Sequence, residues 1–197
     1  MDPALERALI AGDRPRAVVL VEGVSDQRAV EALARRRGRD LAGERVVVAA
    51  LGGATAIGQL LELLGPHGRG LRLAGLCDAG EESRFRRALE QAGLATDLDR
   101  AGMEALGFHV CDADLEDELI RSLGPARVEA VVEAEGELAA FRTFQAQPGW
   151  QGRSPEAQLR RFLGTRGGRK IQYARLLVEV LDLDRVPRPL DQLLAHL

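Results

Sequence analysis

Four short apolar segments, each followed by a helical pattern, most constrain what this chain can fold into. The apolar segments are residues 17–22, 46–51, 71–77 and 107–111. In the helical patterns apolar residues recur every three or four positions, as over residues 57–64. Strands that alternate with helices form a parallel sheet with helices on both faces. We therefore predict an α/β core over residues 16–124, with a small, mostly parallel, four-stranded sheet.

The remainder of the chain shows only helical patterns. Residues 126–145 and 155–164 are predicted to be helices, a third covers residues 174–181, and a short last one ends at Leu197. We expect residues 125–197 to form a helical extension packed on the core. A length of 197 residues is typical of one domain, so residues 1–197 are predicted to be a single domain.

Composition excludes several classes of protein. Hydrophobic residues make up 46% of the chain and charged residues 29%, which is typical of a globular protein and not of a disordered one. No apolar run reaches the roughly 18 residues of a membrane helix. The first residues contain acids and no long apolar stretch, so we expect no secretory signal and no membrane partner. The expected location is the cytoplasm.

Charge is distributed unevenly along the chain. The net charge of −3 excludes a uniformly basic coat for nucleic acid. Residues 112–137 carry a net charge of −7, whereas residues 153–175 carry +6. Such a pair of segments suits a metal site beside a phosphate-binding surface. Solvated helix faces of opposite sign are the other explanation, and both stay open here.

Lys170 is the single lysine among 27 basic residues. Genomic base composition that favours arginine codons explains the bias but not the exception. An ammonium group is compact, whereas a guanidinium is planar and forked. The lone lysine therefore indicates a position where a point charge is needed.

Acidic residues follow three of the four predicted strands. Glu22 ends the first strand and Asp78 the third, and Asp114 and Glu116 come shortly after the fourth. The carboxyl ends of parallel strands share one edge of the sheet, where functional groups gather. Clustered carboxylates repel one another unless a cation lies among them, and they are the ligands that Mg²⁺ and Mn²⁺ prefer. Taken singly, Asp26 and Asp114 could instead complement the N-termini of helices.

The segment LVEGVSD at residues 20–26 resembles the first motif of the TOPRIM domain. This Rossmann-like α/β domain occurs in topoisomerases, primases and overcoming-lysogenization-defect (OLD) nucleases. Glu22 and Gly23 match its conserved pair, and Asp26 supplies the acid of the OLD-like version. The second motif is an Asp-x-Asp, of which Asp78 matches the first acid. Gly80 replaces the second, for which Glu81 or Glu82 is a candidate substitute.

Two later elements also resemble the OLD-like domain. Asp114-Leu115-Glu116 matches its Asp-Leu-Glu, and Lys170 matches its catalytic lysine ahead of a late helix. The resemblance spans about residues 16–185 and implies a TOPRIM-like fold. OLD nucleases also carry an ATPase domain, and no Walker motif is present in this sequence. If an ATPase is needed, we expect it on a separate partner protein.

The resemblance implies a divalent-metal-dependent endonuclease or phosphodiesterase with two Mg²⁺ or Mn²⁺ ions. Glu22 and Asp26 would hold one ion, Asp114 and Glu116 the other, and Asp78 would bridge or support both. Glu22 and Lys170 are the expected catalytic residues, with Lys170 neutralising charge in the transition state. The expected phosphate contacts, to DNA first and to RNA as the other choice, are Arg160, Arg161, Arg166 and Arg169.

Two other functions compete with this one. A non-catalytic TOPRIM module that binds nucleic acid or a partner in DNA repair, recombination or phage defence is favoured by the missing second acid. A phospho-accepting receiver domain also has an Asp after its third strand and a later lysine. Receiver domains need paired acids after the first strand and a lysine after the fifth, so this reading ranks third.

Overall fold

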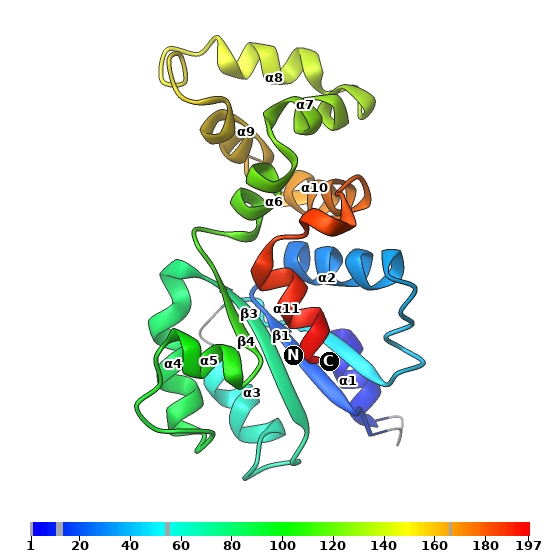
Figure 1. Ribbon diagram of the computed structural model, residues 1–197, viewed down its shortest axis with the longest axis vertical. Coiled ribbons are helices and arrows are strands. Elements are labelled where there is room, and N and C mark those ends of the chain that lie inside the picture. The colour runs from blue at the N-terminus through cyan, green and yellow to red at the C-terminus, as the bar shows by residue number, and fades with distance from the viewer. Residues whose placement is uncertain (1, 11–13, 54–55, 166) are drawn as a thin grey trace.

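The computed structural model describes residues 2–10, 14–53, 56–165 and 167–197. Helices and strands alternate through the first half of the chain, and only helices follow (Figure 1). In chain order the elements are α1 (Pro3–Ile10), β1 (Ala17–Val21), α2 (Val24–Arg36), β2 (Val46–Ala50), α3 (Ile57–Leu64), β3 (Arg72–Asp78), α4 (Glu82–Gln91), α5 (Arg100–Ala105), β4 (Phe108–Cys111), α6 (Leu115–Leu123), α7 (Pro125–Ala134), α8 (Leu138–Gln145), α9 (Pro155–Leu163), α10 (Gly167–Glu179) and α11 (Arg188–His196).

The four strands form one parallel sheet in the order β2-β1-β3-β4. Val21 at the end of β1 pairs with Ala50 in β2 and with Leu76 in β3, and Asp78 pairs with Cys111 in β4. This register brings the carboxyl ends of all four strands to the same edge. The structure thus confirms the predicted parallel sheet and the shared edge beyond it.

Helices cover both faces of the sheet because its strands are apolar on both sides. In β1, Ala17, Val19 and Val21 point into one buried cluster, and Val18 and Leu20 point into the other. The first cluster also contains side chains of α2, α6 and the later helices, and the second those of α1, α3, α4 and α5. Burial of both faces explains why the strands read as continuous apolar runs.

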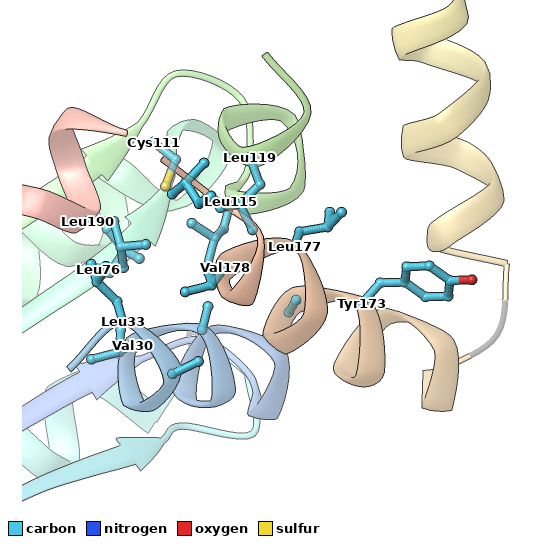
Figure 2. Close-up of a cluster of buried hydrophobic side chains, with 14 of the residues drawn as sticks. Val30, Leu33, Leu76, Cys111, Leu115, Leu119, Tyr173, Leu177, Val178 and Leu190 are labelled. Carbon is cyan, nitrogen blue, oxygen red and sulfur yellow. The ribbon is translucent and has the colours of Figure 1, made fainter. Parts of the chain in front are cut away.

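The last two helices return to the sheet after α7, α8 and α9 have extended away from it (Figure 1). α10 packs along α2, and α11 lies against β3 and β4. Figure 2 shows the seam, where Val30 and Leu33 of α2 face Val178 of α10. This packing brings the start of α10 close to the carboxyl edge of the sheet.

The structure differs from the sequence prediction in several helices. The helix predicted over residues 126–145 is two helices, α7 and α8, because the chain turns at Gly136, whose φ is +72°. α1 and α5 were not predicted. The N-cap residue of α2 is Gly23. No helix within the described ranges is long and apolar enough to span a membrane.

Candidate metal centre

Glu22 and Asp78 lie at the ends of the two central strands, β1 and β3. The backbone N–H of Asp78 donates a hydrogen bond of 2.7 Å to Oε1 of Glu22. This bond satisfies one carboxylate oxygen of Glu22 and fixes its direction. Both side chains are half-buried. The two acids are therefore held beside each other at the middle of the sheet edge.

Asp26 lies in the first turn of α2 and is almost fully buried. Its Oδ2 accepts a hydrogen bond of 2.9 Å from the backbone N–H of Gly23. Asp26, the third residue of α2, thus bonds back to the N-cap residue Gly23 and stabilises the start of the helix. Burial raises its pKa, against the opposing effect of the Gly23 hydrogen bond and the nearby Lys170. Asp26 therefore both stabilises the start of α2 and lies near the other acids.

Asp114 and Glu116 belong to the N-terminal end of α6. Oδ1 of Asp114 accepts a hydrogen bond of 2.8 Å from the backbone N–H of Asp117, so Asp114 is the N-cap. Its Oδ2 lies 2.6 Å from a guanidinium nitrogen of Arg160 in α9. Glu116 is buried, and its Oε2 lies 3.1 Å from Nζ of Lys170. Oε1 of Glu116 is buried without a hydrogen-bond partner in the described part of the chain.

The carboxylates at this edge repel one another. Burial, followed by the charges of the four other acids, raises the pKa of Asp78 to about 8. Burial also raises the pKa of Glu116 to about 7, although Lys170 opposes the rise. The pKa values of Glu22 and Asp26 are raised as well, chiefly by burial. The five acids therefore form one electrostatic group in which negative charge is in excess.

Lys170, near the start of α10, is the cation of this group. Burial lowers its pKa, but the ion pair with Glu116 and the nearby charges of Asp26 and Asp78 outweigh burial and raise it. The ammonium therefore stays charged. Lys170 and Arg160 together do not balance five carboxylates, and Glu116 still has an unsatisfied oxygen among the described residues. The group therefore offers carboxylate oxygens and a net negative charge, and such a set of ligands fits a hard divalent cation.

The carboxylates do not yet enclose an ion. Among the described residues, no three Asp, Glu, His or Cys side chains are close enough together to hold one. In this arrangement Arg160 pairs with Asp114, and Lys170 pairs with Glu116. Binding of a metal to either acid would have to compete with these cations.

Glu81 and Glu82, the candidate substitutes for the missing acid at Gly80, have different environments. Glu81 forms an ion pair with Arg84 and is near enough to Glu22 to help raise its pKa. Glu82 instead lies 2.6 Å from Arg100. Of the two, Glu81 is the acid associated with the candidate centre.

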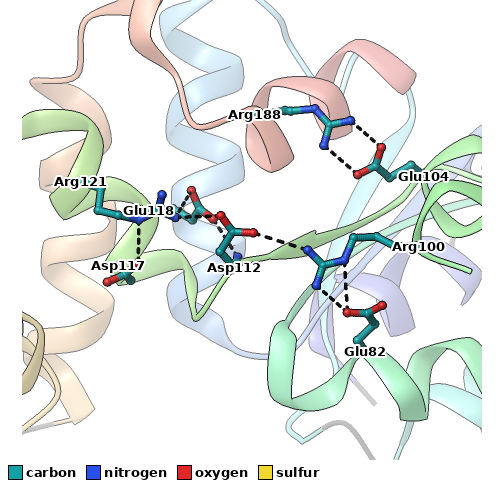
Figure 3. A network of polar contacts seen from close by, with 8 residues as sticks. All are labelled: Glu82, Arg100, Glu104, Asp112, Asp117, Glu118, Arg121 and Arg188. Carbon is teal, nitrogen blue, oxygen red and sulfur yellow. Dashed lines mark hydrogen bonds and ion pairs between the residues drawn. The ribbon is translucent and has the colours of Figure 1, made fainter.

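Asp112 follows β4 directly but belongs to a separate ion-pair network. Figure 3 shows it between Arg100 and Arg121, which lie 3.5 Å from its two carboxylate oxygens. Nearby, Arg188 of α11 contacts Glu104 of α5 at 2.6 Å. This network ties the C-terminal helix to the core and contributes nothing to the candidate centre.

The predicted phosphate-binding arginines divide into three groups. Arg160 and Arg161 line a pocket of about 570 Å³ that also includes Asp114 and Lys170. Arg169 is buried, contacts Glu137 at 2.6 Å and covers the ring of Phe162 at 4.1 Å. The predicted phosphate contact of Arg169 would require its guanidinium to leave these contacts inside the protein. Arg166 lies outside the described residues.

Arg153 and Trp150 line the same pocket. Arg153 was expected only as a member of the basic segment 153–175, and Trp150 was not predicted to be a site residue. Arg153 lies just before α9, whose N-cap is Ser154. The net charge of the segment was therefore the signal for Arg153, and no pattern in the sequence marked Trp150.

Comparisons with known proteins agree with this fold. Residues 15–79 match the family model described as "Overcoming lysogenization defect protein-like, TOPRIM domain". The C-terminal region of the Burkholderia pseudomallei OLD protein is similar to this chain with a TM-score of 0.68 and 21% identity, over 92% of this chain and 96% of that one.

The C-terminal region of the Xanthomonas campestris pv. campestris OLD protein is similar in two further structures. The TM-scores are 0.70 and 0.69 at 23% and 24% identity, covering 92% and 93% of this chain and 91% and 94% of theirs. No curated protein matches the sequence significantly. Residues 15–79 thus match the OLD-like TOPRIM model by sequence, and the fold of the chain is similar to that of the C-terminal regions of OLD proteins.

Proposed function

We propose that this chain is a divalent-metal-dependent nuclease that hydrolyses phosphodiester bonds, with DNA as the first candidate substrate. The observation that carries the proposal is the group of five acids at the sheet edge, together with the only lysine of the chain. Mutual repulsion and burial raise the pKa of Asp78 to about 8. A group so costly to ionise is typical of a functional site and not of a solvated surface.

The proposed ligands follow from the positions of the acids. Glu22 and Asp26 would hold one Mg²⁺ or Mn²⁺, Asp114 and Glu116 a second, and Asp78 would support both. Bound ions would orient a water molecule and offset negative charge on the phosphate and the leaving oxygen. Glu22 suits its role because the Asp78 N–H fixes one of its oxygens and leaves the other free to bind.

Lys170 would stabilise the charge that develops on the phosphate in the transition state. Its ammonium is already aimed at the acids, 3.1 Å from Glu116. Once cations take over that acid, Lys170 is free to contact a phosphate oxygen. Arg160 would be released from Asp114 in the same way and, with Arg161, would bind the phosphate backbone.

A non-catalytic module that binds nucleic acid or a partner protein is the second candidate. Two observations favour it: Gly80 stands where an acid is expected, and no three ligands in the described residues enclose an ion. In that case Arg160 and Lys170 would hold the acids permanently and the pocket would serve binding alone.

Cleavage and metal binding, measured together, test the proposal. Purified protein is incubated with supercoiled plasmid and with single-stranded DNA or RNA in Mg²⁺ or Mn²⁺, with and without a candidate ATPase partner, and Mn²⁺ binding is measured by calorimetry. We expect cleavage that Glu22→Gln abolishes, because glutamine keeps the hydrogen bond from Asp78 but loses the charge. Glu62→Gln, at an exposed position of α3, is the matched control and should remain active.

Two results would contradict the proposal. Cleavage equal in Glu22→Gln and in the original protein would indicate a contaminating nuclease. Absence of cleavage in every combination, together with DNA binding that needs no divalent ion, would favour the binding module.

A further inference from the structure

The pocket beside the candidate metal centre extends beyond the residues that the proposed chemistry needs. Its volume of about 570 Å³ lies within the range of small-molecule sites and is large enough for a nucleotide. Asp114, Glu116 and Lys170 of the candidate centre form part of its lining. Trp150, Arg153 and Arg161 form another part, and none of the three is needed to hold a metal ion.

The charges in this pocket do not cancel. Arg160 is paired with Asp114, and Lys170 with Glu116. The side chains of Arg153 and Arg161 line the same pocket, and neither has an ion-pair partner among the residues that the structure describes. The pocket therefore carries two uncompensated positive charges, which suits an anion with more than one negative group.

Trp150 adds an aromatic surface to these charges. It is half-buried, and its ring lies 5.0 Å from that of Phe144, so one side is supported by the protein while the residue also lines the pocket. Its backbone carbonyl accepts a hydrogen bond of 2.7 Å from the Gln158 side chain. Ser154 caps α9 immediately after Arg153. The loop is thus fixed before any ligand arrives.

We propose that this pocket binds one unstacked nucleotide of a single strand, next to the bond that is cleaved. Trp150 would stack on the base, and Arg153 and Arg161 would contact the adjoining phosphates. Aromatic and arginine side chains in this combination are typical of single-strand recognition, and the bases of an intact duplex are not accessible for such stacking. The position next to the cleaved bond rests on the proposed nuclease function, whereas the binding itself does not.

Trp150 is the single tryptophan of the chain, so its fluorescence reports on this pocket alone. The protein is titrated in EDTA at low salt with a six-residue oligothymidylate, with thymidine monophosphate, with inorganic phosphate and with a blunt duplex. We expect saturable quenching by the single strand, with weaker binding of the mononucleotide and none of phosphate or duplex at equal concentration.

Variants of the two arginines make the test specific. Arg153→Gln and Arg161→Gln should each weaken binding of the single strand and each lower the slope of log K against log salt by about 0.7. Arg87→Gln removes the same charge from an exposed position on α4 and should change neither quantity. Trp150→Ala, followed by gel shift, should weaken binding about 5- to 150-fold, the usual range for one stacked base.

Each other outcome has a definite meaning. If the mononucleotide binds as tightly as the oligonucleotide, the ligand of the pocket is a free nucleotide and the proposal is overturned. Absence of quenching by the single strand would also overturn it. An equal loss in Arg87→Gln would show general charge attraction and overturn it too. Quenching without cleavage under any condition would reject the nuclease function and leave the single-strand pocket standing.

Discussion

Removing the charge of Asp78 should make the metal-free protein more stable, although it removes a proposed metal ligand. Asp78 has a pKa of about 8, because burial and four neighbouring acids disfavour its ionised form. Its carboxylate accepts no hydrogen bond from the described residues, so Asp78→Asn loses repulsion and no contact. The backbone N–H that binds Glu22 is kept.

The pH dependence of this effect follows from the raised pKa. A carboxyl group that takes up a proton more readily in the folded state stabilises the fold at low pH, and that stability is lost as pH rises from about 4 to about 8. The full shift would correspond to at most roughly 5 kcal/mol at pH 8. The side chain is only half-buried and water screens the repulsion, so we expect a gain of about 1 to 2 kcal/mol in Asp78→Asn.

Thermal unfolding in EDTA measures the gain. For a chain of this length, about 1 to 2 kcal/mol raises the Tm by about 2 to 8 °C. The rise should appear at pH 8 and vanish near pH 4, and Asp40→Asn at an exposed position should show neither change. Saturating Mn²⁺ should raise the Tm of the original protein more than that of Asp78→Asn, because a ligand of the folded state stabilises it. An Asp78→Asn variant that is less stable at every pH would show that the ionised carboxylate does not destabilise the fold.

Three further substitutions probe the cations and the missing acid. Lys170→Arg should lower the cleavage rate on the order of 10²-fold while DNA binding and Tm are kept, whereas full activity would remove the catalytic role of the lysine. Arg160→Ala frees Asp114 from an ion pair whose arginine is partly exposed, and calorimetry should show Mn²⁺ binding about 2- to 5-fold tighter; unchanged affinity would mean that Asp114 is no ligand. Gly80→Asp restores the second acid and should also tighten Mn²⁺ binding, which an equal or weaker affinity would contradict.

The core of the fold could be predicted because its signals are local. The run Ala17–Val21 is buried on both faces, so its apolar character is continuous and visible in the sequence. Glu22 and Asp78 follow strands directly, and parallel pairing alone brings them to one edge. The helix break at Gly136 was missed because one glycine in a helical pattern does not by itself show a positive φ.

The ion pairs that the site residues form could not be predicted from the sequence. Arg160 and Asp114 are 46 residues apart, and their pairing depends on how α9 packs against α6. Arg169 was assigned to the surface because it lies in a basic segment next to Lys170. The segment is helical, so neighbouring residues point in different directions, and Arg169 is directed into the protein toward Glu137. Charge runs in a sequence do not show which of their members are buried.

A crystal soaked with Mn²⁺ gives the most direct test of the proposed metal centre. We expect anomalous peaks at the sheet edge, bound by Glu22 and Asp78 and by Asp114 or Glu116, with Arg160 displaced from its present partner. An edge without peaks at saturating Mn²⁺, in which Arg160 still holds Asp114 and Lys170 still holds Glu116, would contradict it.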